Sequence, residues 1–264
     1  MDLWSTYRLQ IVTNCQKGRC LMKIFHFGNK ESNIVLIQMV YDHELEAIEN
    51  EVALIKKLSQ ISDFHFIAVK VDNWNDDLSP WEAPAVFGNE TFGGNAKKTL
   101  DSLLNEVINP LKQSKSADLK IYIGGYSLAG LFALWSVCKM DTFSQRDIVM
   151  SSASDESISP VVLGNAASQP LFAGCVAASP SVWFPGFVDY ISANEISADK
   201  IYLSLGNKEE KTRNPVMRQV GECIRNIYDM LNGKTNVVLE WNEGNHFQET
   251  DLRMAKGFAW ILKK

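Results

Sequence analysis

From residue 34 onward, the sequence alternates short apolar runs with longer stretches whose apolar residues recur every three or four positions. Short apolar runs are typical of strands buried on both faces, and the longer spacing is typical of helices that cover a core. This alternation predicts a mostly parallel sheet, because helices carry the chain back across its faces. The order of elements constrains the fold more than any single motif does.

The alternation places eight strands and five helices along the chain. The strands are predicted at residues 7–13, 20–27, 34–40, 66–71, 119–124, 173–178, 201–205 and 237–241. The helices are predicted at 43–58, 95–113, 128–139, 215–231 and 250–262, with Asn214 as the N-cap and Gly233 as the C-terminal stop of the fourth. The first three strands follow one another without a helix, which indicates an antiparallel edge. The predicted fold class is α/β, with helices on both faces of a mostly parallel eight-stranded sheet.

The chain has 264 residues, no internal repeat and no linker rich in Pro, Gly or Ser, so we expect a single domain over residues 1–264. One stretch differs from the rest. Residues 144–169 lie between a predicted helix and a predicted strand, where about two to six residues suffice. We expect an insertion here, either a lid or a surface segment without a catalytic role.

The composition excludes several classes of function. The chain carries 26 Lys and Arg against 31 Asp and Glu, a net charge of −5, which argues against a nucleic-acid partner. The apolar runs are too short to cross a membrane, and we find no signal peptide. The five cysteines include no Cys-x-x-Cys pair and the four histidines are scattered, so we expect free thiols in the cytoplasm, no metal site and no other cofactor.

The segment 121–130, Ile-Tyr-Ile-Gly-Gly-Tyr-Ser-Leu-Ala-Gly, leads from a strand directly into an apolar helix. A serine in such a tight turn exposes its hydroxyl at the carboxyl end of the sheet, and it needs small residues two positions before and after it. Gly125 and Ala129 meet this need around Ser127, which is the candidate nucleophile. The alternative is an ordinary strand–helix turn in which the serine is only a cap.

A nucleophilic serine needs a base, and the base needs a carboxylate that orients it. His246 lies between the last predicted strand and the last helix, in a loop that opens at the same edge of the sheet as Ser127. Glu209 follows the seventh strand and is the first candidate for the acid, while Glu210 stays open as the alternative. The other histidines are expected to be structural or solvated: His26, His43 and His65.

The oxyanion of an acyl-transfer reaction needs preorganised N–H donors. The backbone amide of Leu128, directly after the candidate nucleophile, is the first predicted donor. The second is predicted from position alone and is the backbone amide of Tyr41, at the end of the third strand.

Aromatic side chains follow two of the predicted strands at the same edge. Trp74 and Trp81 lie in the long loop 72–94, and Trp183 follows the sixth strand. They predict an aromatic wall for an acyl or aryl group, and the alternative is packing beneath the loops. Arg213, after the seventh strand, is a candidate for contact with an anionic substrate, or else a solvated arginine.

Four segments together resemble the α/β-hydrolase superfamily, and within it the esterase family that includes S-formylglutathione hydrolase (esterase D) and the enterobactin-type siderophore esterases. The segments are Gly-Gly-Tyr-Ser-Leu-Ala-Gly130, Ala-Ser-Pro-Ser-Val-Trp183, Leu-Gly-Asn-Lys-Glu209 and Gly-Asn-His-Phe247. The likeness covers most of the chain from residue 34 onward. The resemblance implies that Ser127 is the nucleophile, His246 the general base and acid, and Glu209 the orienting acid.

These residues predict a serine hydrolase that cleaves carboxylic esters of small molecules through an acyl-enzyme on Ser127. Two alternatives stay open. The first is a hydrolase-fold protein that binds a ligand or partner without turnover. The second is an acyltransferase or peptidase that uses the same site. The natural substrate and the oligomeric state are left open by the sequence.

Overall fold

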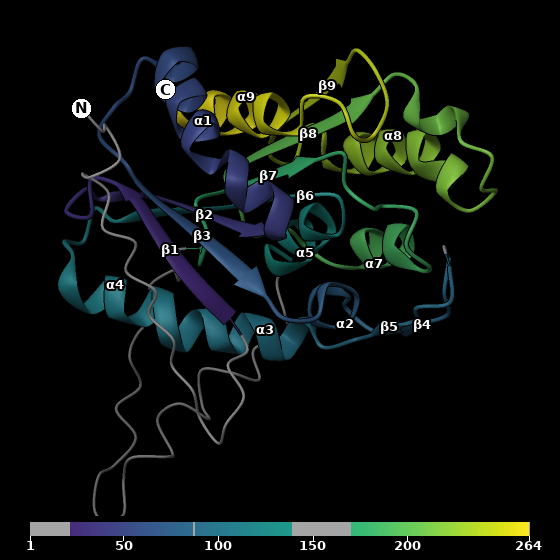
Figure 1. The fold of residues 1–264 in the computed structure, drawn as a ribbon, viewed down its shortest axis with the longest axis horizontal. Helices are drawn as coiled ribbons and strands as arrows, with labels where there is room; N and C mark the ends of the chain where they lie inside the picture. Colours follow the sequence, from purple (N-terminus) through teal and green to yellow (C-terminus); the bar gives the residue numbers. More distant parts are fainter. Residues whose placement is uncertain (1–21, 87, 139–169, 264) are drawn as a thin grey trace, which may run out of the picture.

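The computed structural model describes residues 22–86, 88–138 and 170–263, and its centre is a seven-stranded sheet (Figure 1). The strands lie in the order β1-β3-β2-β6-β7-β8-β9, and every neighbouring pair is parallel except β1 and β3. Their bounds are β1 Met22–Gly28, β2 Ile34–Val40, β3 His65–Val71, β6 Lys120–Tyr126, β7 Gly174–Ala178, β8 Lys200–Gly206 and β9 Asn236–Asn242. Two further strands, β4 (Glu82–Ala83) and β5 (Phe92–Gly93), form a separate small pair.

The predicted α/β class, the mostly parallel sheet and the antiparallel edge are confirmed. The predicted number of strands differs from the structure, since the sheet that is described has seven strands and not eight. The first predicted strand, residues 7–13, lies outside the described residues, and so does the predicted insertion at 144–169. The other seven predicted strands all occur, with ends shifted by at most two residues because end residues lack strong periodicity.

Helices cover both faces of the sheet and bury one apolar core on each. On one face, α1 (Asp42–Ser59) and α9 (Thr250–Leu262) lie side by side, at the top of Figure 1. They bury Ile48, Ile55 and Phe258 against the aromatic and aliphatic side chains of the central strands. The other face is covered by α2 (Trp74–Leu78), α3 (Ala96–Leu103), α5 (Leu128–Ser136), α7 (Phe187–Ala193) and α8 (Val220–Leu231).

Three of the predicted helices differ from the structure in detail. The helix predicted at 128–139 ends at Ser136. The helix predicted at 95–113 consists of α3, a π-helical turn at Leu104–Ile108 and α4 (Asn109–Ser114). The helix predicted at 215–231 begins only at Val220. The side chain of Asn214 instead accepts hydrogen bonds from the amides of Val216 and Met217, and so caps a short 3-10 turn. The short elements α2, α7, β4 and β5 were not predicted, since five to seven residues, or two, give too little periodicity.

The topology brings loops that are distant in the sequence to one edge. Parallel strands end at the same edge, so the residues that follow β2, β6, β7, β8 and β9 are neighbours there. Ser127 follows β6, Glu209 follows β8 and His246 follows β9. None of the helices in the described part of the chain is both long and apolar enough to cross a membrane.

Candidate active site

Ser127 occupies a strained turn between β6 and α5. Its φ of 57° and ψ of −121° lie outside the conformations that residues with a side chain usually adopt. The turn is so tight that a Cβ at Gly125 would lie 2.4 Å from the carbonyl carbon of Ala129. Gly125 therefore has to be a glycine, and the small side chain of Ala129 is needed for the same reason. The backbone N–H of Ser127 donates to the carbonyl oxygen of Ala178 on β7, at 3.1 Å.

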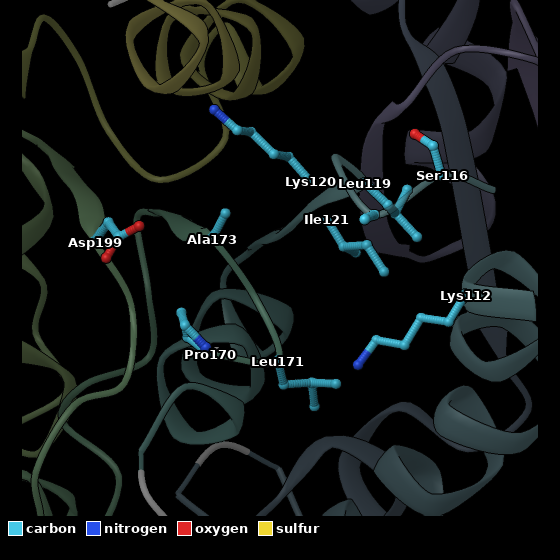
Figure 2. A pocket seen from close by; sticks show the side chains of 10 residues that line it. Lys112, Ser116, Leu119, Lys120, Ile121, Pro170, Leu171, Ala173 and Asp199 are labelled. Carbon is cyan, nitrogen blue, oxygen red and sulfur yellow. The ribbon is translucent and has the colours of Figure 1, made fainter. Parts of the chain in front are cut away.

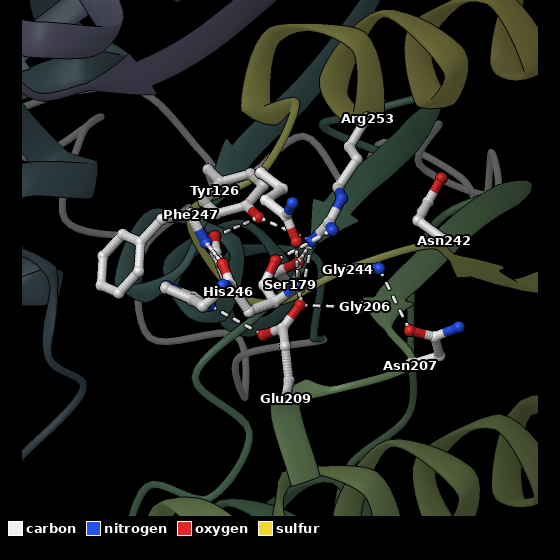
Figure 3. Close-up of polar contacts among 12 residues, drawn as sticks. Tyr126, Ser179, Gly206, Asn207, Glu209, Asn242, Gly244, His246, Phe247 and Arg253 are labelled. Carbon is white, nitrogen blue, oxygen red and sulfur yellow. Dashed lines mark hydrogen bonds and ion pairs between the residues drawn. The ribbon is translucent and has the colours of Figure 1, made fainter. Parts of the chain in front are cut away.

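His246 lies between the serine and a carboxylate. Its Nε2 is 3.0 Å from Ser127 Oγ, and its Nδ1 is 2.7 Å from Glu209 Oε2, a contact drawn in Figure 3. A carboxylate only accepts hydrogen bonds, so Nδ1 carries the proton and Nε2 is left to accept the hydroxyl proton. This is the tautomer that a general base for Ser127 requires.

Glu209, and not Glu210, contacts the histidine. Glu209 is 8% exposed, and its Oε1 accepts hydrogen bonds of 2.7 Å from both Ser179 Oγ and the amide of Gly206. Burial raises the pKa of Glu209, but the hydrogen bond and charge of His246, with the bonds from Ser179 and Gly206, bring it below its ordinary value. Glu210 points away and forms an exposed ion pair of 3.0 Å with Arg225.

Arg253 is a fully buried arginine that the sequence analysis missed. Its Nη1 lies 3.0 Å from Glu209 Oε1, 3.1 Å from Ser179 Oγ and 3.0 Å from the hydroxyl of Tyr126 (Figure 3). Its Nη2 donates to the carbonyl oxygens of Glu243 and Asn245, at 3.0 and 2.9 Å. The helical periodicity could have indicated that Arg253 is buried, because it lies on the same face of α9 as Gly257 and Ile261.

Tyr126 contacts the loop that carries His246 through both its hydroxyl and its ring. Its hydroxyl donates to the backbone carbonyl of His246 at 2.7 Å, and its ring packs at 5.3 Å against the imidazole. Burial raises the pKa of Tyr126 to about 12, so the hydroxyl stays protonated and remains a donor. The loop that carries His246 is thus tied to β6 as well as to α9.

The two predicted oxyanion donors have different surroundings. Leu128 is the first residue of α5, directly after Ser127, so its amide has no acceptor within the helix. The amide of Tyr41 donates to Glu44 Oε2 at 2.6 Å. Burial raises the pKa of Glu44, while the bond from Tyr41 and the charges of His43 and His246 oppose that rise.

A cavity of about 560 Å³ opens in front of Ser127 and His246. Trp183 and Phe247 form apolar parts of its wall, and the ring of Phe247 is 85% exposed. The cations that line it come from the loop after β8: Lys208, Lys211 and Arg213. Glu209 is the sole carboxylate among its described lining residues, and it is already bound by His246.

The three predicted substrate tryptophans lie in different places. Trp183 lines the cavity. Trp81 packs against Phe184 and Tyr190, and its indole N–H donates to the carbonyl oxygen of Pro185 at 2.9 Å. Trp74 packs edge-on against the ring of Tyr41, with 5.4 Å between ring centroids. Only Trp183 of these three lies with Ser127 along the cavity.

A second hollow of about 540 Å³ lies near the amino ends of β6, β7 and β8 (Figure 2). Lys112, Lys120 and Asp199 line it, together with apolar residues such as Leu171. Its described lining residues include no histidine and no cysteine, and the hydroxyl of Ser116 accepts a hydrogen bond of 2.7 Å from Asn33 Nδ2. The described residues of this hollow therefore include no serine–histidine–carboxylate arrangement like that of Ser127, His246 and Glu209.

His26 and His65 form a pair far from the candidate site, in agreement with the expectation that they are structural. His26 Nδ1 lies 3.0 Å from His65 Nε2, on neighbouring strands β1 and β3. Burial, together with the charges of His26, Lys115 and Lys30, lowers the pKa of His65 to about 3. The pair is therefore neutral at physiological pH.

Comparison with known proteins gives matches among solved structures alone, since no protein-family model and no curated protein matches the chain. An IroE-like serine hydrolase from Shewanella oneidensis is 14% identical, with a TM-score of 0.66 over 90% of this chain and 75% of that one. The siderophore hydrolase EstA from Aspergillus nidulans is 15% identical, with a TM-score of 0.63 over 97% and 94%. The enterobactin and salmochelin hydrolase IroE is 15% identical, with a TM-score of 0.57 over 92% and 89%.

The chain has the α/β-hydrolase fold. The resemblance indicated by the four sequence segments is thus confirmed at the level of the fold. In the α/β-hydrolase fold, a nucleophile follows a central strand in a sharp turn, and acid and histidine follow later strands in that order. The order Ser127, Glu209, His246 and the turn at Ser127 agree with this arrangement.

Proposed function

We propose that the protein is a serine hydrolase that cleaves carboxylic esters of small molecules through an acyl-enzyme on Ser127. The observation that carries this proposal is the unbroken chain of hydrogen bonds from Ser127 Oγ through His246 to Glu209, with lengths of 3.0 and 2.7 Å. The strained turn at Ser127 supports it, because strain of this kind is maintained where an exposed nucleophile is needed.

The first half of the reaction acylates the serine. His246 Nε2 takes the hydroxyl proton as Ser127 Oγ bonds to the carbonyl carbon of the ester, and the carbonyl oxygen becomes an oxyanion. The amides of Leu128 and Tyr41 are the proposed donors to that oxyanion. Collapse of the intermediate breaks the bond to the alcohol oxygen, which leaves with the proton from His246.

The second half releases the acid. A water molecule gives its proton to His246 and attacks the acyl carbon, and Ser127 leaves with that proton. Glu209 stays ionised throughout and stabilises the imidazolium that forms twice per turnover, since its hydrogen bonds favour the charged carboxylate.

The cavity supports a substrate with an apolar and an anionic part. Trp183 and Phe247 offer contact to an acyl or aryl group, and the cationic rim from Lys208 to Arg213 offers contact to negative charge. The solved structures with the same fold include proteins named as siderophore, enterobactin and salmochelin hydrolases, which agrees with hydrolysis of small-molecule esters. A cytoplasmic location stays a prediction, in line with free thiols at Cys138, Cys175 and Cys223.

Ser127→Ala tests the proposed function on p-nitrophenyl esters of short acids, with labelling by a fluorophosphonate as the second readout. We expect a loss of about 10⁴-fold or more in kcat/KM and loss of the label. Ser181→Ala is the matched control, because its hydroxyl lies 3.3 Å from Ser127 Oγ but contacts neither His246 nor Glu209 in the described hydrogen bonds. Turnover that survives in Ser127→Ala contradicts the proposal.

Two other outcomes favour the alternative functions. Ligand binding without turnover by the wild type favours a non-catalytic protein, and products formed with added alcohol or amine favour acyl transfer.

A further inference from the structure

The backbone amide of Tyr41 lies where a second oxyanion donor belongs. Met39 on β2 pairs with Gly125 on β6, so two more steps along both strands bring Tyr41 beside Ser127. Neighbouring strands lie about 4.8 Å apart, which is the separation that two donors flanking one oxygen atom require.

This amide is already bound by the protein itself. Glu44, in the first turn of α1, accepts its N–H through Oε2 at 2.6 Å, and the Glu44 side chain is buried, with 8% of the residue exposed. A single N–H has one hydrogen, and a carboxylate and an oxyanion that share it repel each other. The Glu44 contact and oxyanion binding at Tyr41 therefore exclude one another.

The Glu44 carboxylate shares a small hollow with Tyr126, whose ring packs at 5.3 Å against the imidazole of His246. The charge of His246 acts on it across the loop after β9, and His43 acts on it from α1. The other polar and titratable groups around the Glu44 side chain come from several elements: Gln38 from β2, Glu51 from α1, Tyr126 from β6, and Asp251 from α9. Glu51 is buried and hydrogen bonds to Gln38, so it does not compete for the Tyr41 amide.

Helix capping alone is the simpler explanation of this contact. A glutamate three residues after the N-cap commonly binds the N-cap amide. Capping accounts for the stability of α1, but it uses the same hydrogen that the oxyanion needs. The two explanations predict different rates when the Glu44 carboxylate is removed. If Glu44 only caps the helix, hydrolysis stays unchanged or becomes slower, and if it also competes for the Tyr41 amide, hydrolysis becomes faster.

We propose that Glu44 is an internal competitor for the oxyanion hole, which must release the amide of Tyr41 before Ser127 can be acylated. This inference rests on the proposed function. The reaction then proceeds through the fraction of molecules in which the carboxylate has left Tyr41, so the apparent rate is reduced by that fraction.

The test compares kcat/KM of Glu44→Ala, Glu44→Gln and the wild type at pH 8 with a neutral p-nitrophenyl ester. We expect Glu44→Ala to be faster than the wild type by about tenfold, because one oxyanion donor contributes about 10²–10³-fold in kcat and only part of that is lost to competition. Glu44→Gln should be intermediate, because a neutral amide oxygen accepts the Tyr41 N–H more weakly than a carboxylate. Glu49→Ala, which removes an exposed charge from the same helix, should leave the rate unchanged.

The pH dependence gives a readout that capping does not supply. The ratio of Glu44→Ala to wild-type kcat/KM should fall toward one as the pH drops through the raised pKa of Glu44, because the protonated carboxyl competes less. A crystal structure of the phosphonate adduct on Ser127 should have the phosphoryl oxygen bound to the amide of Tyr41, with Glu44 displaced.

Three results overturn the inference. If hydrolysis depends on Ser127 but neither Glu44 variant exceeds the wild-type rate, the competition is absent and the proposed function stands. A phosphonate adduct in which Glu44 still binds the Tyr41 amide has the same meaning. If the wild type and both variants neither hydrolyse esters nor react with fluorophosphonate, the proposed function fails as well.

Discussion

Arg253 connects the acid, the histidine loop and β6 through one buried guanidinium. It lies 3.0 Å from Glu209 Oε1 and donates to two carbonyl oxygens of the loop that carries His246. Arg253→Met removes the charge at similar length and leaves these acceptors buried. We expect a loss of about 3–5 kcal/mol in the free energy of unfolding, measured by urea denaturation, since one half of a buried ion pair is removed.

The same substitution tests whether Arg253 positions the proposed catalytic groups, His246 and Glu209, electrostatically. Without the guanidinium, the charge of Glu209 is less compensated, so the imidazolium of His246 is held more strongly. The acid limb of the kcat/KM profile should therefore move to higher pH in Arg253→Met, and Arg253→Lys should restore part of the wild-type profile. Arg225→Met, which breaks the exposed pair with Glu210, is the control and should cost about 1 kcal/mol or less with no change in the profile. An unmoved acid limb in Arg253→Met would mean that this arginine has a structural role alone.

At the scale of elements, the loop between β8 and α8 sets the charge at the mouth of the cavity. The side chain of Asn214 donates to the carbonyl oxygen of Val86 at 2.7 Å, and Arg218 Nε donates to the carbonyl oxygen of Thr212 at 3.1 Å. These bonds hold the loop so that Arg213 lines the cavity.

Arg213→Glu should therefore change the preference between two esters that differ only in charge. We expect kcat/KM for a succinyl monoester to fall about threefold to tenfold relative to its neutral methyl-succinyl analogue, and the effect to shrink at high salt. Lys234→Glu makes the same charge change at an exposed position outside the cavity lining and should leave the ratio unchanged. An equal loss on both esters would assign Arg213 a role in the loop rather than in substrate charge.

The sequence predicts which residues follow the strands of the sheet, but it does not predict which side chains contact one another. Ser127, Glu209 and His246 were predictable because each follows a strand with clear periodicity, and parallel strands end at one edge. The contacts of Arg253 were not, because they depend on how α9 docks on the sheet, and helical periodicity predicts a face but no partner. The Glu44 contact is local, but it requires Tyr41 to be the N-cap, and the predicted helix starts one residue too late for that. Of the three tryptophans, Trp183 lines the cavity and Trp74 and Trp81 pack elsewhere, since position in a loop does not determine which side chains turn toward the cavity.

For the whole molecule, the buried His65, paired with the half-buried His26, predicts how stability depends on pH. Folding lowers the pKa of His65 to about 3, below its ordinary value near 6.5, because burial disfavours the imidazolium. Between these values the unfolded chain binds a proton that the folded protein does not bind, so stability falls as the pH decreases through this window. The slope from one such group is at most about 1.4 kcal/mol per pH unit.

His65→Phe removes this titration while keeping an aromatic ring stacked on that of His26. We expect the free energy of unfolding of the variant, measured in urea at pH 7, 6, 5 and 4, to decrease less steeply than that of the wild type. Because His65 lies at the start of β3, away from Ser127, the kcat/KM of the variant at pH 8 should stay at the wild-type value. His43→Phe is the control, because it makes the same chemical change at an exposed position, and the slope should change less than in His65→Phe. Parallel slopes for wild type and His65→Phe would assign the acid sensitivity of the fold to its carboxylates, with Glu209 foremost, since its lowered pKa also makes stability fall as the pH decreases.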